Sequence, residues 1–354
     1  MKKGNSIVGG FIILIVGICL LWWNEGNNVK NIESVNEGMK NYIDIDSSKV
    51  DTKNDGKLVA THGDLVVTGE ISDDVFGVTS SSAALLRNVE MYQWVEDCDS
   101  DDKNCTYTTE WKDYVVDSSG FKEAGHSNPE NMLYETETFT SSNATIGSFT
   151  LPDKLVNSLS TKHKITNLPE TVAGNDSFTL SNNYYTNVRD GKAEVGNIRV
   201  SFFDNDAKVV SVLAEQSGNT FKVYKTKKGK DLFRIFEDNY DGNDMLTIIS
   251  KQNNFMKWLF RIVGILAVIG GIGSLFSPIT NLVGRIPILG GIVNGATGVV
   301  SFVLGLAISL VVIAIAWFRF RPLLSIILII IVGALILGLK TYSNKHPKEE
   351  KTVK

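Results

Sequence analysis

The residue types that most often perform catalysis are sparse in this chain and far apart. None of its four histidines lies four residues from another histidine or from a cysteine, and no His-Glu-x-x-His metal site occurs. The Gly-x-Ser-x-Gly elbow of a serine hydrolase is also absent. Ser119 and Lys122 have Ser-x-x-Lys spacing without its companion motifs. We therefore expect no catalytic, cofactor-binding or metal-binding residues and no enzymatic activity. The histidines are His62, His126, His163 and His346.

Two of the three cysteines lie close together. Cys98 and Cys105 enclose a short loop, and in an oxidising compartment this spacing favours a disulfide that closes a hairpin; two free thiols are the alternative. Cys19 lies in an apolar run, where it acts as a small apolar residue. The aspartates between 97 and 102 could attract calcium, but the glycine and glutamate of an EF-hand loop are missing. A solvated acidic loop is the favoured interpretation.

Charge is distributed unevenly along the chain. Residues 24–256 contain 23 Lys and Arg against 37 Asp and Glu, a net charge of −14. The remainder contains 12 basic and 2 acidic residues, a net charge of +10. Nucleic acid is disfavoured as a partner of the acidic part, because phosphate binding needs Lys and Arg.

Four apolar runs explain this distribution. Each is about long enough to cross ~30 Å of hydrocarbon at 1.5 Å per residue. We expect a four-helix integral membrane protein of the α+β class, with a large strand-rich insert between crossings one and two. The predicted parts are an N-terminus at 1–6, crossings at 7–23, 258–276, 290–317 and 322–339, the insert at 24–257, an interfacial loop at 277–289, a short turn at 318–321 and a basic tail at 340–354.

The positive-inside rule gives an orientation. Lys2 and Lys3 precede the first run, and no small-x-small cleavage site follows it, so we expect an uncleaved anchor with a cytosolic N-terminus. The insert then faces the lumen or periplasm, and the basic tail returns to the cytosol. Arg285 agrees with this orientation, whereas Arg319 and Arg321 oppose it.

Strand patterns dominate the insert. Val89–Glu96 alternates without a clean apolar face, which predicts a strand packed on both sides, and Trp111–Val116 is its predicted partner. His62-Gly63-Asp64, between two apolar stretches, predicts a hairpin turn. Lys227–Lys230 predicts another, with a basic edge that discourages strand pairing. Strand-rich stretches on both sides of 121–151 leave two subdomains open as an alternative to one domain.

Small residues recur along the third predicted crossing. Such a stripe lets helix backbones approach closely, either within one chain or between chains as a homo-oligomer. Polar residues on this crossing leave a channel-like oligomer as an alternative. The helix-packing candidates are Gly291, Gly295, Ser301, Gly305 and Ser309.

Several stretches, in this order, resemble the transmembrane protein 43 family, also called LUMA. They are Asn24-Glu25-Gly26; Val89-Glu90-Met91-Tyr92-Gln93-Trp94; His126-Ser127-Asn128-Pro129; Glu194–Phe202, which includes Arg199; and Trp317 with Arg321-Pro322-Leu323. The similarity covers nearly the whole chain. It supplies no catalytic residues, and the Cys98–Cys105 loop matches no family motif.

The resemblance implies a membrane-organising protein. On this resemblance we expect a self-associating protein of the endoplasmic reticulum or inner nuclear membrane if the chain is eukaryotic, and an inner-membrane protein with a periplasmic domain if it is bacterial. We expect a non-enzymatic scaffold that contacts lipid and other membrane proteins and binds no nucleic acid. A channel-like homo-oligomer and a membrane-anchored enzyme with a site near His62 or His126 are the alternatives.

Overall fold

The computed structural model describes residues 3–99, 104–172, 176–283, 289–322 and 326, without side chains for 3–6 and 277–296. These residues form two compact units. The helical unit consists of residues up to Glu37, the turn Thr226–Lys230 and the chain from Leu246 onward. The strand unit consists of Gly38–Lys225 and Asp231–Met245. Two of the boundaries between them fall inside long helices, and the other two flank the turn Thr226–Lys230.

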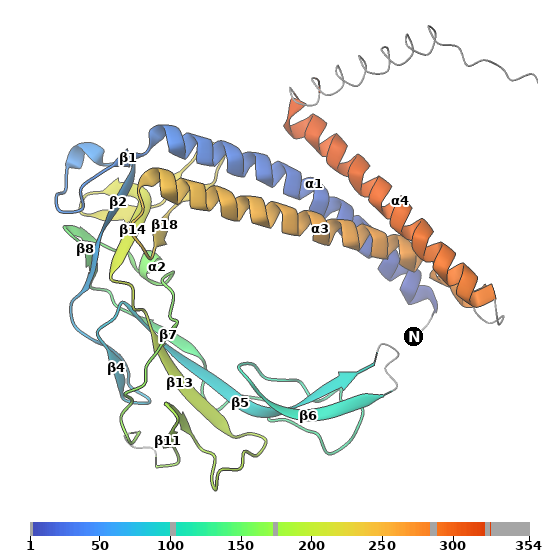
Figure 1. Cartoon of the computed structure of the whole chain (residues 1–354), viewed down its shortest axis with the longest axis horizontal. Coiled ribbons are helices and arrows are strands. Elements are labelled where there is room, and N and C mark those ends of the chain that lie inside the picture. Colours follow the sequence, from blue (N-terminus) through green and yellow to red (C-terminus); the bar gives the residue numbers. More distant parts are fainter. Residues whose placement is uncertain (1–2, 100–103, 173–175, 284–288, 323–325, 327–354) are drawn as a thin grey trace, which may run out of the picture. The chain divides into compact units, whose positions relative to one another are not determined.

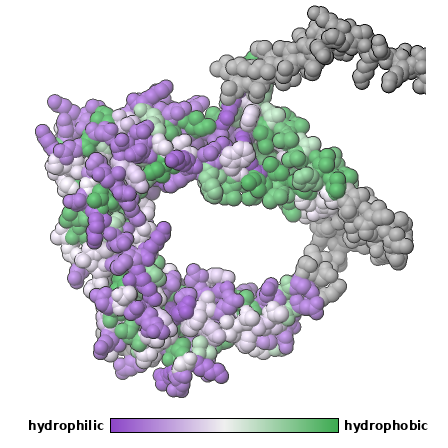
Figure 2. All heavy atoms as spheres, in the orientation of Figure 1, coloured by the Kyte–Doolittle hydropathy of each residue, from purple (hydrophilic) through white to green (hydrophobic). Residues whose placement is uncertain are grey.

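Three helices of the described chain are long and apolar enough to cross a membrane. They are α1 (Lys3–Asn41), α3 (Gly242–Val283) and α4 (Leu289–Phe320) (Figure 1). They contain the first three predicted crossings. The fourth, 322–339, lies almost entirely outside the described residues. In Figure 2, hydrophobic residues cover much of the helical unit, whereas hydrophilic residues cover most of the visible strand unit.

The helices are longer than the apolar runs. α1 continues without a break beyond the predicted crossing, and the predicted turn at 318–321 is helical as far as Phe320. The predicted interfacial loop at 277–289 begins as helix, because α3 runs on to Val283. Hydropathy locates the lipid-exposed part of a helix, but backbone hydrogen bonds continue wherever neighbouring polar residues also favour a helix.

The first sheet of the strand unit closes on itself. Its order is β1-β2-β8-β9-β15-β14-β18, and β2 also pairs with β14, so five of its strands form a ring. Val59, Ile146, Phe149 and Val212 are fully buried in its core, and α2 (Asp153–Val156) adds Leu155. The strands are β1 (Ile43–Asp44), β2 (Leu58–Val67), β8 (Ala144–Ile146), β9 (Phe149–Thr150), β14 (Val209–Ser217), β15 (Thr220–Lys222) and β18 (Arg234–Phe236); η1 (Thr52–Asn54) precedes β2.

The hairpin turn predicted at His62-Gly63-Asp64 is wrong. These residues lie inside the continuous strand β2 and pair with β14, His62 opposite Ser211 and Gly63 opposite Val210. Gly63 marks a close approach instead, since a Cβ there would lie 2.8 Å from Ser47 Oγ. The sequence pattern alone did not separate a glycine required by a turn from one required by a tight contact.

The second sheet is organised around the fifteen-residue strand β5 (Ala84–Cys98). β13 (Ile198–Asp204) pairs with one edge of β5, and β7 (Glu137–Thr140) and β6 (Cys105–Lys112) pair successively with the other. A second hydrophobic cluster, which includes Phe76, Leu85, Tyr185 and Phe202, packs on this sheet. The remaining strands are β10 (His163–Lys164), β11 (Thr179–Ser181) and β12 (Tyr184–Thr186).

Two small hairpins complete the set. β3 (Ile71–Asp73) pairs with β4 (Val78–Ser80), and β16 (Tyr224–Lys225) pairs with β17 (Asp231–Leu232) around the predicted basic turn. The chain alternates between the two large sheets, so their cores contain interleaved segments. A single break at 121–151 therefore does not divide the insert into two subdomains.

Candidate functional site

Three helices meet at one buried carboxylate. Glu25 of α1 is 1% exposed, and it accepts hydrogen bonds from Arg261 of α3 at 2.6 Å (Nε) and 2.8 Å (Nη2). The indole Nε1 of Trp317, in α4, donates to the same carboxylate at 2.8 Å. These residues are 236 and 292 positions from Glu25 in the sequence. We call Glu25, Arg261 and Trp317 the three-helix junction.

Within the junction, the charges of Glu25 and Arg261 compensate each other, and either one alone would be costly to bury. The Arg261 guanidinium lies 4.9 Å from the ring centre of Trp258 and 5.8 Å from that of Trp317. Arginine suits this position, because its planar group stacks on rings while it donates two bonds to one carboxylate. Breaking such a buried pair leaves an uncompensated charge, so each member fixes the position of the others.

The residues beside Glu25 also contact neighbouring helices. Asn24 Nδ2 donates to the backbone oxygen of Lys257 at 3.0 Å. A Cβ on Gly26 would lie 2.8 Å from the ring of Phe320, so only glycine fits there without rearrangement. All three residues of the family stretch Asn24-Glu25-Gly26 therefore take part in helix packing.

Small residues allow close helix contact further along the same helices. A Cβ on Gly10 would lie 2.6 Å from Ser274 Cβ, and one on Gly271 would lie 2.7 Å from the backbone nitrogen of Leu14. Gly17 and Gly264 make similar contacts with Val268 and Leu21. Gly10 and Gly17 are seven residues apart, as are Gly264 and Gly271. The sequence analysis did not predict this close packing of α1 on α3. The seven-residue spacing of the glycines was the signal that could have indicated it.

Part of the predicted stripe is buried, and one of its residues packs closely on α3. Ser301 is 4% exposed and Ser309 is fully buried, with its hydroxyl donating to the Gly305 carbonyl at 2.7 Å. A Cβ on Gly305 would lie 2.7 Å from the Ile269 Cα. These three residues thus lie in packing within one chain. Gly291 and Gly295 lie outside the residues with described side chains.

Family residues of the strand unit anchor a long irregular segment to β5. Buried Gln93 donates to the Tyr114 carbonyl at 2.7 Å and accepts from Val116 N at 2.8 Å. Asn128 accepts from Trp94 N at 2.7 Å and donates to the Trp94 and Val116 carbonyls at 2.9 and 3.2 Å. The Asn128 amide replaces a strand partner that the Trp94 backbone lacks, and the Gln93 amide satisfies backbone groups of the irregular segment, as buried backbone groups require.

Glu90 and Arg199 join β5 to β13. They lie opposite each other in the register, and Arg199 donates to Glu90 from Nε at 2.6 Å and from Nη2 at 2.8 Å. The guanidinium also lies 4.7 Å from the ring centre of Trp111. Pro129 contacts the close turn at Gly196, and Val89 and Met91 lie in the second core. These family residues contribute structure. Arg321 lies 5.8 Å from the Trp317 ring, and Pro322 follows it.

His126 belongs to an aromatic cluster. Its ring stacks on Tyr107 with centres 4.1 Å apart and meets Trp94 edge-on at 4.4 Å, and its Nδ1 is buried with no hydrogen-bond partner in the described part of the chain. Tyr107 donates to Glu96 at 2.5 Å. That bond, with a second from Lys122 N, lowers the pKa of Glu96, while desolvation and then the same bond raise the pKa of Tyr107.

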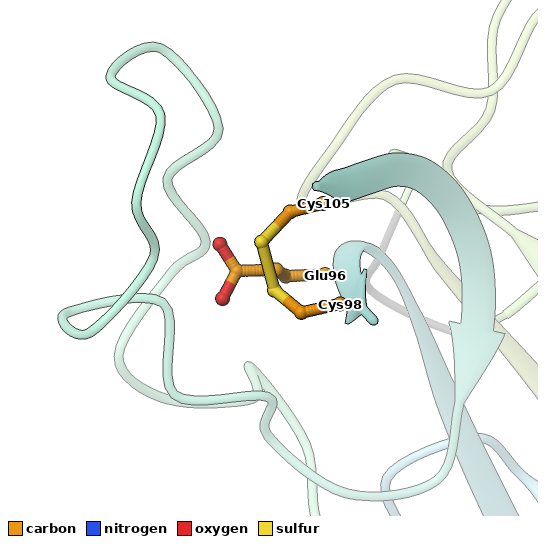
Figure 3. A group of neighbouring side chains, drawn as sticks. All are labelled: Glu96, Cys98 and Cys105. Atoms are coloured by element: carbon orange, nitrogen blue, oxygen red, sulfur yellow. A yellow bond between two sulfur atoms is a disulfide. The ribbon is translucent and has the colours of Figure 1, made fainter. Parts of the chain in front are cut away.

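The cysteine pair lies beside Glu96, as Figure 3 shows. Cys98 and Cys105 face each other across the end of β5 and β6 and are joined by an S–S bond of 2.05 Å. Ligand atoms of the two cysteines and Glu96 lie within 4.8 Å of one another. Metals bind thiolates, and the sulfurs of a disulfide are poor ligands. The cysteine pair therefore links the two strands of the hairpin covalently.

A third histidine lines a small cleft. His163 Nδ1 lies 2.7 Å from Asp204 Oδ1, and Ser80 donates to Asp204 Oδ2 at 3.1 Å. The cleft of about 210 Å³ is lined by His163, Asp204 and Ser82, among others. A serine nucleophile needs its base on the hydroxyl, whereas here the aspartate lies between serine and histidine. The geometry lacks the order of a catalytic triad.

The remaining candidates are dispersed. His62 is exposed on β2. Ser119 lies in a turn where its backbone N–H donates to Asp117, and Lys122 N donates to Glu96. His346 lies outside the described residues. Sequence reasoning also missed a buried ion pair in which Arg87 donates to Asp73 at 2.7 Å; an arginine inside an apolar strand run was its signal.

Comparisons of the sequence with known proteins identify the family. The family model described as Transmembrane protein 43 matches residues 91–322. The chain is 28% identical to Transmembrane protein 43 of Mus musculus over 344 residues, 91% of this chain and 86% of that protein. It is 27% identical to the Homo sapiens protein, over 92% and 87%, and 24% identical to the Drosophila melanogaster homolog, over 91% and 90%. No solved structure matches it. With more than half of the chain matched by the model, and three helices able to cross a bilayer, this integral membrane protein belongs to the transmembrane protein 43 family.

Proposed function

We propose that this protein is a non-enzymatic membrane scaffold. It organises other membrane proteins, or the membrane itself, through its strand-rich domain and its packed helices. The observation that carries the proposal is that polar family residues form hydrogen bonds within the protein. These residues are Glu25, Gln93, Asn128 and Arg199. Such residues hold a surface in shape, as a scaffold requires.

The compartment of the strand-rich domain is part of the proposal. Its acidic charge, the basic residues flanking the apolar runs and the disulfide all fit a luminal or periplasmic domain. Exposed apolar residues on the strand unit, such as Val66, Tyr114 and Leu133, are candidates for partner contact.

Photo-crosslinking in intact membranes tests the scaffold role. A photoreactive phenylalanine is placed singly at Val66, Tyr114 and Leu133, which are 51, 59 and 69% exposed. Exposed Glu70 and Lys192 serve as control positions. We expect one recurring set of membrane proteins to be captured from an apolar position and not from the controls. Adducts with lipid alone, or identical adducts at all five positions, would contradict the proposal.

The channel alternative makes a separate prediction. Polar residues that line a pore must face water, but Ser301 is 4% exposed and Ser309 is fully buried. We therefore expect liposomes containing the purified protein to release K⁺ no faster than liposomes containing a heat-inactivated sample. Protein-dependent, saturable ion release would support the channel instead.

A further inference from the structure

The polar parts of α1 and α3 line a half-open cavity of about 270 Å³. All of its lining residues belong to the helical unit. Its apolar lining residues are Ile32 and Val35, and its polar lining is rich in amides and lysines. The polar residues that carry the argument are Asn28, Asn31, Lys251, Asn253, Asn254 and Lys257.

The end of the cavity nearest the hydrocarbon, at Asn28 and Lys257, lies at the depth of lipid head groups. Trp22, Trp23 and Trp258 are 38, 52 and 53% exposed, and such tryptophans mark the edge of the hydrocarbon. Asn28 is five residues beyond Trp23, which is about 7.5 Å along a helix at 1.5 Å per residue. Each head-group layer is about 5–7 Å thick, so Asn28 lies within or at the edge of that layer.

The charge of the lining is positive in an otherwise acidic segment. It contains Lys251 and Lys257 and no carboxylate. The nearby acids of α1 point to other partners: Glu33 pairs with Lys228 at 2.7 Å, and Glu37 accepts from Lys227 N at 2.9 Å. Among the described residues, neither lining lysine forms an ion pair with an acidic side chain. An anion is the ligand that this lining favours.

The lining also contains a buried hydrogen-bond donor, the side-chain amide of Asn28. Asn28 is 4% exposed, and its Nδ2 has no hydrogen-bond partner among the residues that the structure describes. Buried amide groups without partners are rare, because they lose their bonds to water without replacement. Lys257 donates to Asn254, which holds the ammonium group at the cavity. Asn28 lines the cavity, so an oxyanion that reaches its amide would supply the missing acceptor.

We propose that this cavity binds the phosphate group of an anionic membrane phospholipid. Lys257 provides charge and Asn28 a directional donor at head-group depth, and Lys251, about 10.5 Å along α3 from Trp258, adds positive charge at the outer end. Below the cavity, Trp258, Ile262 and Leu266 form an exposed apolar row on α3, 53, 53 and 61% exposed, at four-residue spacing. Acyl chains of a lipid held by its phosphate have this row to pack against.

Native mass spectrometry of the purified full chain tests the site. Phosphatidylglycerol and phosphatidylcholine are added in equal amounts, and the bound lipids are weighed. We expect preferential retention of phosphatidylglycerol, with Lys251→Gln and Lys257→Gln each weakening it about fivefold. Asn28→Leu weakens it as well. Lys30→Gln, which removes the same charge from an exposed position on α1 outside the cavity, is the matched control and should have no effect.

Inorganic phosphate separates a lipid from a soluble ligand. If millimolar phosphate competes with phosphatidylglycerol, and Lys251→Gln weakens both, the phosphate group is what the cavity recognises. If phosphate binds without any lipid preference, the lipid assignment is overturned. Equal retention of both lipids would also overturn the lipid assignment. So would a loss of phosphatidylglycerol retention in Lys30→Gln equal to that in the cavity variants. Should Asn28→Leu fail to fold, the exposed Lys251 decides the outcome.

Discussion

At the scale of single residues, the three-helix junction contains two buried charges that depend on each other. Glu25 is 1% exposed and Arg261 is 8% exposed, so neither charge can be solvated if the other is lost. A buried ion pair adds little stability compared with apolar residues of the same size, but removing one partner is costly. Its value is therefore in fixing how three helices pack.

Glu25→Gln should lower the free energy of unfolding by about 3–5 kcal/mol. Thermal unfolding of the full chain in detergent is the measurement. Glu33→Gln is the matched control, because Glu33 lies on the same helix, pairs with Lys228 and is 43% exposed at its side chain. An exposed pair contributes about 0–1 kcal/mol, so the control should change little. Equal effects of the two changes would refute the role of the junction.

The Glu96 carboxylate gives the strand unit a defined response to acid. Its pKa is lowered by the Tyr107 hydroxyl and by Lys122 N, so ionised Glu96 stabilises the fold. This contribution is complete above the ordinary glutamate pKa of about 4.3 and is lost as the pH falls through the lower folded value. Glu96→Gln should remove that part of the acid sensitivity.

A pH series of unfolding midpoints from about 3 to 7 checks this prediction. Tyr107→Phe removes one donor and leaves Lys122 N in place, so it should show an intermediate effect. An acid slope that is the same in Glu96→Gln and the unchanged protein would show that other carboxylates control the transition.

At the scale of elements, the amides of Gln93 and Asn128 hold an irregular segment against β5. Asn128→Ala removes three hydrogen bonds and leaves the Val116 carbonyl with one partner fewer. We expect a loss of about 2–4 kcal/mol, at roughly 1 kcal/mol for each bond. Limited proteolysis at Lys122, within the segment, should become faster.

Asn131→Ala serves as the control for that change, because Asn131 is exposed three residues along the same segment. Its cleavage rate should match that of the unchanged protein. If Asn128→Ala is also unchanged, the segment is held by the aromatic cluster around His126 rather than by the amides.

Helix packing makes its own prediction at Gly305. A Cβ there would lie 2.6 Å from Ile269 Cγ1 and 2.7 Å from Ile269 Cα, so Gly305→Ala must push α4 away from α3. We expect a loss of about 1–3 kcal/mol in thermal unfolding. Gly298→Ala, on the same helix with nothing within 4 Å, should be neutral or stabilising. A neutral Gly305→Ala would show that the helices adjust freely.

At the scale of the whole molecule, the orientation of the chain in the membrane remains a prediction. Four crossings place Ser119 and Ser343 on opposite faces. In a Cys19→Ala background that keeps the disulfide, Ser119→Cys and Ser343→Cys should react with an impermeant maleimide from opposite sides of oriented vesicles. The background protein without an added cysteine should not react. Labelling of both positions from one side would mean that one apolar run does not cross.

The sequence by itself determined what depends on neighbouring residues. Apolar runs located the membrane helices, because crossing a bilayer needs about twenty apolar residues in succession. The mixed alternation of Val89–Glu96 correctly indicated a strand, and Lys227–Lys230 correctly indicated a hairpin turn. Ordered motifs identified the family without any contact being known.

Only the tertiary structure decided which distant groups meet. Glu25 and Arg261 are 236 residues apart, and nothing in either local pattern specifies the other. The same limit explains Gly63, where local signals for a turn yielded to pairing with β14. The interleaved sheets and the cavity that includes Asn28 also depend on contacts between distant segments. Local periodicity reports which face of an element is buried, whereas the identity of the burying partner depends on free energies gained across the whole fold.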